Sequence, residues 1–259
     1  MAPVLQRHID AVARYPDPTD ATAALAEAIG IDGERILLTN GGSEAIALLA
    51  AEWPAGWVDE PDFSLYARHL TTLDRNGPRW RSNPHNPSGR LAADGERADV
   101  WDEAFYPLAT GRWTRGDGRV ALGSLTKLFA CPGLRSGYVV AAPAFIARLR
   151  HRQPRWSVNG LVCQALPELV EAADLPAWAA VITGLRADLC DLLAAHGLTA
   201  EAHEGCWVLV HHAGDLRAEL ARHGVLVRDC ASFGMPGTVR IGVPSPGGLE
   251  RLSACLRPR

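Results

Sequence analysis

The sequence predicts an α/β protein with a mainly parallel sheet, followed by a smaller α+β lobe. Over the first part of the chain, short apolar runs that end in polar or glycine-containing turns alternate with helical stretches. From about residue 145 the helical stretches become longer and the strands fewer. The 259 residues, 47% of them hydrophobic, suffice for one large domain or two modest ones with a sizeable core. We therefore expect a large domain at residues 1–150 and a small C-terminal domain at 151–259.

The expected elements follow from apolar patterns and caps along the chain. Thr19 and Asp20 are candidate N-caps of a helix at 21–29, which Gly30 ends. A strand at 36–39 leads through two glycines into an apolar helix at 44–53. Further strands are expected near 57–58, 98–101 and 120–122. After them come helices at 144–153 and 161–195, a strand at 206–211, a helix at 216–223, a strand at 239–243 and a helix at 249–256.

Composition and charge argue against several classes of protein. With 26 basic and 29 acidic residues, the chain lacks the basic excess of a protein that binds nucleic acid or a membrane surface. No apolar run reaches the roughly 18 residues of a membrane span, and residues 1–16 lack the apolar stretch of a signal peptide. The six cysteines are far apart, and no His/Cys cluster indicates a metal site. We expect a cytoplasmic protein with reduced thiols and no metal.

The most informative segment is 120–140, which contains the only lysine of the chain, Lys127. It follows a predicted strand, and open α/β sheets bind ligands at the carboxyl ends of their strands. The other 25 of the 26 basic residues are arginine, which suggests that Lys127 does something a guanidinium cannot, such as forming a Schiff base. Ser124 and Lys127 also fit the S-x-x-K motif of penicillin-recognising enzymes, but a chain with one lysine has no K-T-G element to accompany it.

A resemblance to a known family begins at this lysine. Ser124-Leu-Thr-Lys127, followed eight positions later by Arg135 after a glycine-containing stretch, resembles the lysine motif of fold-type I aminotransferases of class I and II, which use pyridoxal 5'-phosphate (PLP). The nearest branch is the histidinol-phosphate aminotransferase and threonine-phosphate decarboxylase group. The resemblance implies the PLP-dependent transferase fold of the aspartate aminotransferase type, in a compact version. It implies an internal aldimine at Lys127 and phosphate ligands at Ser124 and Arg135, with Thr126 close by.

Two further segments resemble this family on the side of the cofactor phosphate and ring. Residues 39–44, Thr-Asn-Gly-Gly-Ser-Glu, resemble its phosphate loop, which implies cofactor contacts at Gly42, Ser43 and Glu44. The physics of the loop points the same way, because glycines and free N–H groups at a helix N-terminus favour an anion; a plain N-cap is the alternative. Residues 61–66 resemble the segment whose aromatic ring stacks on the cofactor. Phe63 is the first candidate for that ring and Tyr66 the second.

The next two motifs concern the polar contacts of the cofactor ring. Residues 83–89, Asn-Pro-His-Asn-Pro-Ser-Gly, resemble the turn whose asparagine bonds the phenolic oxygen of PLP, which implies that role for Asn86. Residues 102–105 resemble the Asp-Glu-Ala motif, in which Asp102 would pair with the pyridinium nitrogen and keep the ring an electron sink. Phe105 stands where many aminotransferases have a tyrosine that bonds the phenolic oxygen. Tyr106 comes one position later.

Four residues are implied as contacts with the substrate or with a second subunit. Arg240 resembles the C-terminal arginine that forks the substrate carboxylate. Asn159, in Trp-Ser-Val-Asn, and Arg228, in Arg-Asp-Cys-Ala-Ser-Phe, resemble substrate-side runs of the decarboxylase branch. Tyr15, in Arg-Tyr-Pro-Asp, resembles a tyrosine that reaches the cofactor phosphate of the neighbouring subunit, which implies a homodimer with shared active sites.

The sequence therefore indicates a PLP-dependent enzyme acting on a small amino acid or a phosphorylated amino substrate. Lys127 and Asp102 are its expected catalytic residues. Transamination is the favoured reaction, and a decarboxylase like the threonine-phosphate decarboxylase of cobalamin biosynthesis is the alternative. A PLP-binding remnant without turnover is a further alternative, because the chain is short for the family and a helix between Gly89 and Asp102 is expected to be absent.

Overall fold

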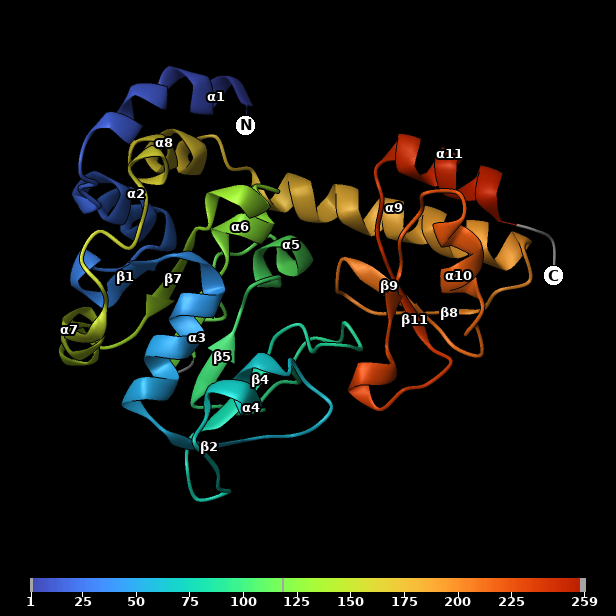
Figure 1. Cartoon of the computed structure of the whole chain (residues 1–259), viewed down its shortest axis with the longest axis horizontal. Helices are drawn as coiled ribbons and strands as arrows, with labels where there is room; N and C mark the ends of the chain where they lie inside the picture. Colours follow the sequence, from blue (N-terminus) through green and yellow to red (C-terminus); the bar gives the residue numbers. More distant parts are fainter. Residues whose placement is uncertain (1, 118, 257–259) are drawn as a thin grey trace.

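The large lobe of the computed structural model, which describes residues 2–117 and 119–256, is built on a seven-stranded sheet (Figure 1). The strands are β1 (Ile36–Thr39), β2 (Ala55–Val58), β3 (Thr72–Leu73), β4 (Arg79–Ser82), β5 (Val100–Asp102), β6 (Val120–Gly123) and β7 (Gly137–Val140), in the order β1-β7-β6-β5-β4-β2-β3. The strands from β6 through β5, β4 and β2 to β3 are parallel, whereas β7 is antiparallel to both β6 and β1. The expected mainly parallel sheet is confirmed.

The strands that end next to the candidate residues all end at the same edge of this sheet. β1 and β6 point in the same direction, because both are antiparallel to β7. The carboxyl ends of β1, β4, β5 and β6 therefore lie at one edge, where β7 begins and where Thr39 pairs with Gly137. Helices α3 (Gly41–Glu52) and α6 (Leu125–Leu128) start at the same edge.

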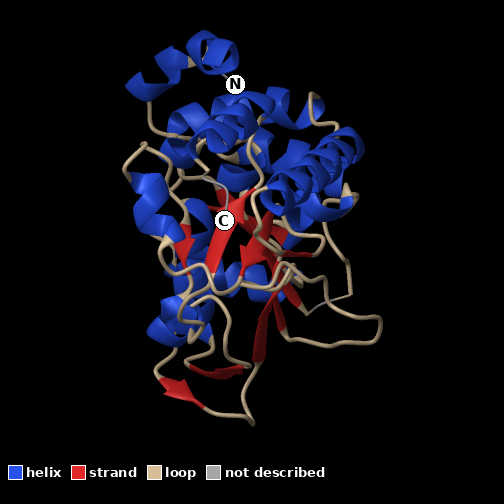
Figure 2. Ribbon diagram, turned by 90° about the vertical axis from the view of Figure 1, so that its right-hand side faces the viewer, coloured by secondary structure: helices blue, strands red, loops and turns tan. Residues whose placement is uncertain are grey.

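Helices cover both faces of the sheet, since neighbouring residues of a strand point to opposite faces. On one face Leu37 and Val139 pack with α3, α4 (Leu65–His69) and α7 (Pro143–Arg152). On the other face Leu38 and Val140 pack with α2 (Thr19–Ile29), α6 and α8 (Gly160–Glu171). The N-terminal elements α1 (Ala2–Arg7) and η1 (Ile9–Ala13) pack on α8, and Figure 2 shows them at the outer end of the molecule. The large lobe is thus a three-layer α/β/α structure.

The small lobe has a four-stranded antiparallel sheet in the order β10-β11-β9-β8. Its strands are β8 (Ala200–Ala202), β9 (Trp207–Val210), β10 (Arg228–Asp229) and β11 (Val239–Gly242). One face, with Val208 and Ile241, packs with α10 (Leu216–Ala221), α11 (Pro246–Cys255) and the end of α9. Trp207 and Arg240 lie on the opposite face, which turns to the large lobe.

Helix α9 (Leu175–Ala195) links the two lobes (Figure 1). Leu175, at its start, belongs to the core cluster of α2 and α8, whereas Leu189 and Leu193 belong to the cluster of the small lobe. A division at residue 150, as expected from the sequence, would separate α8 from the cluster that it shares with α2. The packing therefore favours a boundary inside α9.

The expected helix at 161–195 is two helices, with a break at residues 172–174. Asp174 caps the second one, because its Oδ1 accepts a hydrogen bond from the Ala177 N–H at 3.0 Å. Pro176 follows within the first turn, where proline is favoured. Between Gly89 and β5 the chain forms no helix, as expected, and no helix of the described residues is long and apolar enough to cross a membrane.

Candidate active site

The lysine lies where the ends of the parallel strands face the small lobe. Lys127 belongs to α6, which follows β6 after Ser124. Leu125 and Leu128 of the same helix are buried in the core, whereas Lys127 is exposed. Its Nζ lies 5.7 Å from the centroid of the Phe105 ring. The core contacts of α6 thus hold the amine at the sheet edge with an aromatic ring beside it.

A cradle formed by Gly41, Gly42 and Gly137 lies at the start of α3. Gly41 has a φ of +75°, and a Cβ on it would lie 2.4 Å from Nη2 of Arg135. A Cβ on Gly137 would lie 2.7 Å from the carbonyl carbon of Gly41. A Cβ on Gly42 would lie 4.0 Å from the Cβ of Ser124. The expected phosphate ligands therefore gather around the N–H groups of a 12-residue helix, where an anion is favoured.

Two other residues expected at this loop have partners inside the protein. Glu44 accepts a hydrogen bond from the Asn40 N–H at 2.7 Å, so its carboxylate folds back on the helix start. Thr126 is buried, and its hydroxyl donates to the Ser136 carbonyl at 3.1 Å. Ser43 is exposed in the first turn of α3. Glu44 and Thr126 thus brace the loop, while Ser43 faces solvent at its mouth.

Asp102 ends β5 as a buried carboxyl group. The Tyr66 hydroxyl donates to its Oδ2 at 2.7 Å and the Ala104 N–H to its Oδ1 at 3.0 Å. Burial raises the pKa of Asp102 to about 6, although both hydrogen bonds oppose the rise. Phe63 is 36% exposed and meets Tyr66 edge-on, with the ring centroids 5.6 Å apart. Of the two aromatic candidates, Phe63 is the accessible one, and Tyr66 holds Asp102, a contact that the sequence did not reveal.

Arg240 reaches from β11 of the small lobe to the large lobe. It donates a hydrogen bond to Oδ1 of Asn86, in the turn after β4. Its guanidinium lies 5.0 Å from the centroid of the Trp207 ring, and the Trp207 N–H donates to the Pro87 carbonyl at 2.7 Å. Phe105 packs edge-on against Trp207, with centroids 5.1 Å apart. The rings of Phe105 and Trp207 thus form a wall that extends from Lys127 to Arg240. The sequence contains no motif that indicates Trp207 as a residue of the site.

A second arginine lies beside Arg240. Arg228 on β10 is its register partner across the small sheet. The Arg228 guanidinium lies 5.7 Å from the centroid of the Phe233 ring, and that of Arg240 lies 5.9 Å from the same centroid. Arg228 also donates to the Ser232 hydroxyl at 3.0 Å. Two guanidinium groups thus lie close to one aromatic ring at the edge of the site.

The remaining predicted residues lie at its margin or away from it. Asn159 caps α8, since its Oδ1 accepts from the Val162 N–H at 2.9 Å, and its Nδ2 donates to the Leu134 carbonyl at 2.7 Å. Tyr106 is buried in α5 (Tyr106–Thr110). Tyr15 is 79% exposed, and its ring stacks on Trp156 with centroids 4.4 Å apart. Tyr15 also lines a small pocket with Arg14 and Gln164, and among the described residues that line this pocket there is neither Lys127 nor Arg135.

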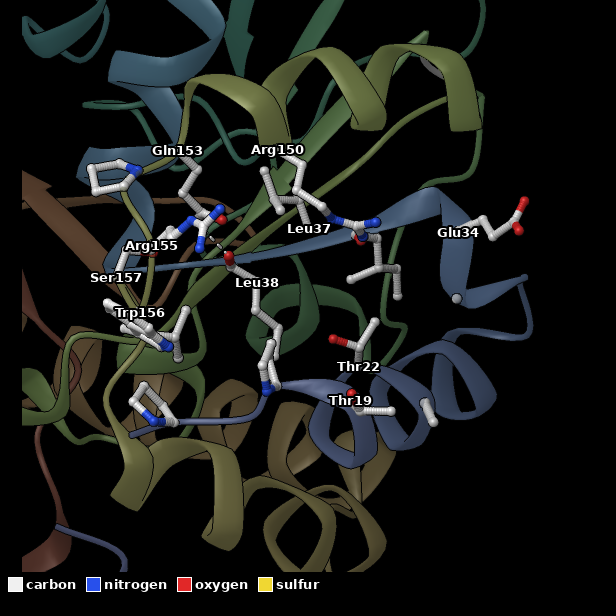
Figure 3. A pocket seen from close by; sticks show the side chains of 17 residues that line it. Thr19, Thr22, Glu34, Leu37, Leu38, Arg150, Gln153, Arg155, Trp156 and Ser157 are labelled. Atoms are coloured by element: carbon white, nitrogen blue, oxygen red, sulfur yellow. Dashed lines mark hydrogen bonds between the residues drawn. The ribbon is translucent and has the colours of Figure 1, made fainter. Parts of the chain in front are cut away.

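A surface cavity of about 630 Å³ lies elsewhere, along the free side of β1 (Figure 3). Arg150, Gln153 and Trp156 line it together with Thr19 and residues of β1. Gln153 donates to the Leu38 carbonyl there at 2.8 Å. None of Lys127, Asp102, Asn86 or Arg240 lines this cavity, so its size alone does not mark it as the reaction site.

The chemistry of the residues at the strand ends fits PLP. The glycine cradle with Arg135 and Ser124 offers backbone and guanidinium donors for a phosphate. A carboxyl group held at the floor of the site suits a pyridine nitrogen, and the neighbouring amine can form a covalent bond with an aldehyde. PLP, when bound, supplies an electron sink for a bond to the substrate α-carbon. Lys127 would hold PLP at its aldehyde group, and Asp102 would hold it at its pyridine nitrogen.

Comparison with known proteins defines the class. The sinorhizobial histidinol-phosphate aminotransferase solved in complex with pyridoxal-5'-phosphate (Sinorhizobium meliloti) superposes with a TM-score of 0.85 at 17% identity, covering 98% of this chain and 85% of that one. The fold is therefore the fold-type I fold of PLP-dependent aminotransferases. The family model "Aminotransferase class I and II" matches residues 80–254, and the chain belongs to this family.

Two curated relatives represent different reactions. Histidinol-phosphate aminotransferase of Halorubrum lacusprofundi is 28% identical, with 97% of this chain and 82% of the relative covered. Threonine-phosphate decarboxylase of Salmonella typhimurium is also 28% identical, with 96% and 84% covered. The resemblance found in the sequence is thereby confirmed at the level of the family, and the two relatives leave the reaction open between amino transfer and decarboxylation.

Proposed function

We propose that this protein is a PLP-dependent aminotransferase acting on a phosphorylated or otherwise anionic amino substrate. The observation that carries the proposal is the convergence of Lys127, Asp102, Asn86 and Arg240 from two lobes around one sheet edge, next to the glycine cradle. The overall reaction exchanges groups between two substrates: an amino donor and a keto acceptor become a keto product and an amino product. No external oxidant is needed.

Each residue has a defined task in this proposal. Arg135 and Ser124 would bind the cofactor phosphate, Phe63 would stack on the ring and Asn86 would contact its oxygen. Asp102 would keep the pyridine nitrogen protonated. Lys127 would hold the cofactor at rest, and its Nζ, once free, would take the proton from the substrate α-carbon and deliver it to the carbon of the cofactor's aldehyde group. Arg240 orients a substrate anion by a forked pair of hydrogen bonds.

Decarboxylation is the second candidate, because the threonine-phosphate decarboxylase of Salmonella typhimurium is 28% identical to this chain, as is the histidinol-phosphate aminotransferase of Halorubrum lacusprofundi. Both reactions use the same residues, and they differ in which α-bond stands perpendicular to the ring. A product assay decides between them. Purified holoenzyme is given histidinol phosphate with a keto acceptor, or O-phosphothreonine. Keto product supports the aminotransferase, carbon dioxide supports the decarboxylase, and neither product with either substrate argues against both.

Arg228 is proposed to recognise a second anionic group of the substrate, since its guanidinium and that of Arg240 lie 5.7 Å and 5.9 Å from the centroid of the Phe233 ring. Arg228→Ala is expected to lower kcat/KM for O-phosphothreonine by about 10–100-fold, as removal of a charged hydrogen bond does, and to change that for threonine little. Arg251→Ala, an exposed arginine of α11, is the matched control. Equal losses for both substrates would contradict the assignment.

We further propose a homodimer in which Tyr15 reaches the cofactor phosphate of the partner. The exposure of the Tyr15 ring supports this role. Tyr15→Phe keeps the stacking on Trp156 and removes only the hydroxyl, so it is expected to weaken PLP retention by about 1.5–3 kcal/mol. Equilibrium dissociation of PLP and light scattering measure the effect. An active monomer at assay concentration would remove the role of Tyr15 and the shared site together.

A further inference from the structure

Asp62 is a buried carboxyl group to which the proposed chemistry gives no task. It follows β2 and is only 2% exposed. In the parts of the chain that the structure describes, no arginine, lysine or histidine lies within ion-pair distance of it. Burial raises the pKa of Asp62, and the nearby His85 acts to lower it against this larger effect. Burying a carboxyl group without a paired cation is costly, and hydrogen bonds must offset the cost. Buried ionisable groups next to an active site often have a role in function.

The hydrogen bonds of Asp62 connect the ends of two neighbouring strands. Its Oδ1 accepts from the Phe63 N–H at 2.7 Å, in the segment after β2. Its Oδ2 accepts from the Ser82 N–H at 3.0 Å, and its Oδ1 accepts from the Ser82 hydroxyl, both at the end of β4. β2 and β4 are parallel neighbours, so one carboxyl group bridges their carboxyl ends.

The connection continues from Ser82 to Asn86. The Ser82 hydroxyl, which donates to Asp62, accepts a hydrogen bond from the Asn86 N–H at 2.8 Å. Asn86 in turn accepts from Arg240 through its side chain. The Asp62 carboxyl group therefore fixes the backbone of Phe63 directly and that of Asn86 through one hydroxyl group.

Since Phe63 and Asn86 are the residues assigned to the face and the oxygen of the cofactor ring, we propose that Asp62 is a positioning residue that sets the spacing between them. This inference rests on the proposed function. A second effect follows from charge: Asp62 lies close enough to Asp102 to raise the pKa of that group, an effect smaller than that of burial, and so favours a proton at the floor of the site.

Two variants break the connection at different points. Ser82→Ala removes the hydroxyl and leaves the backbone N–H that Asp62 uses. Asp62→Asn removes the charge at nearly constant size. Asp59→Asn is the matched control, because Asp59 is a half-exposed carboxylate at the neighbouring position after β2 and pairs with Arg79. The double variant Asp62→Asn/Ser82→Ala tests whether the two residues act as one unit.

The readouts are PLP affinity of the apoprotein, the visible circular dichroism per bound PLP, and the unfolding midpoint of the apoprotein. Each single variant is expected to raise the dissociation constant about tenfold and to reduce the dichroism, and the double variant is expected to be no worse than the worse single one. The visible dichroism reports how the ring is held, which a purely structural role would leave unchanged.

The outcomes separate this inference from the proposed function. Variants with a lower unfolding midpoint but wild-type PLP affinity and dichroism would overturn the positioning role and leave the proposed function intact. Additive losses in the double variant would also overturn it. A wild-type protein that binds no PLP would overturn both. If Asp62→Asn does not fold, Ser82→Ala decides alone, and wild-type PLP affinity and dichroism in this variant would overturn the positioning role.

Discussion

Lys127→Ala is expected to abolish turnover while PLP still binds weakly. The variant loses the only side-chain amine in the chain, and with it both the covalent hold on the cofactor and the group that moves the α-proton. Loss of the proton transfer alone costs about 10²–10⁴-fold in rate. The cradle formed by Gly41, Ser124 and Arg135 remains, so phosphate contacts continue to bind PLP. Single-turnover kinetics and PLP titration measure the two effects separately.

Borohydride reduction tests the same role of Lys127 by chemical modification. In the wild-type holoenzyme, reduction is expected to fix the cofactor to Lys127, which peptide mapping can locate without ambiguity among side chains because the sequence has one lysine. Lys127→Arg is the matched variant, since it retains a positive charge next to Phe105 but cannot form the bond. Turnover by Lys127→Arg, or a reduced wild-type protein with an unmodified Lys127, would show that the amine is not the reacting group.

The sequence predicted the fold where local pattern and buried position agree. The strand expected at 36–39 is β1 with the same bounds, because all four residues are apolar or small enough to be buried on both faces. β4 was not expected, because its Arg-Trp-Arg-Ser alternation reads as a polar segment. Its charges have partners only in the folded protein, where Arg79 pairs with Asp59 and Glu96. Such compensation from distant parts of the chain is invisible to a local pattern.

The candidate site also contains residues that could be predicted from the sequence and residues that could not. Its motifs could be found because each lies directly after a strand, and parallel strands bring their carboxyl ends together. Trp207 and Asp62 could not be found, since their importance arises from contacts across lobes and between neighbouring strands. Thr126 and Glu44 were expected at the cofactor, and the hydrogen bonds that their side chains make with the backbone were not expected. A motif thus predicts the position of a residue in the fold more reliably than it predicts the contacts of the side chain.

Asp102→Asn is expected to change turnover and stability in opposite directions. An amide cannot keep the pyridine nitrogen protonated, so the negative charge that develops at the substrate α-carbon is poorly delocalised. The expected loss in kcat is about 10²–10³-fold at saturating PLP, the scale on which removal of one electrostatic stabiliser acts. The single amide oxygen can still accept from the Ala104 N–H, and the amide NH2 can donate to the Tyr66 hydroxyl oxygen, so PLP binding is expected to fall much less.

The stability of the apoprotein follows from the raised pKa of Asp102. The group has a pKa of about 6 in the folded protein against 3.8 as the ordinary value, so between these values the folded state binds more protons than the unfolded state. The free energy of unfolding therefore falls as the pH rises through this window, by up to about 3 kcal/mol for this one group, and stays lower above it. Asparagine does not ionise. The Asp102→Asn apoprotein is thus expected to be more stable than wild type at neutral pH, and the difference is expected to vanish near pH 4.

Glu103→Gln is the control that separates the two effects. Glu103 is also buried, burial raises its pKa to about 7, and its carboxyl group accepts from the Arg115 N–H at 2.9 Å, on a loop that carries none of the candidate site residues. Its glutamine variant is expected to gain stability at neutral pH in the same way and to keep its turnover. Urea unfolding of the apoproteins from pH 4 to 8 and kcat at saturating PLP test both expectations. Unchanged turnover in Asp102→Asn would reduce Asp102 to a hydrogen-bond acceptor at the end of β5, because its charge would then have no part in the reaction.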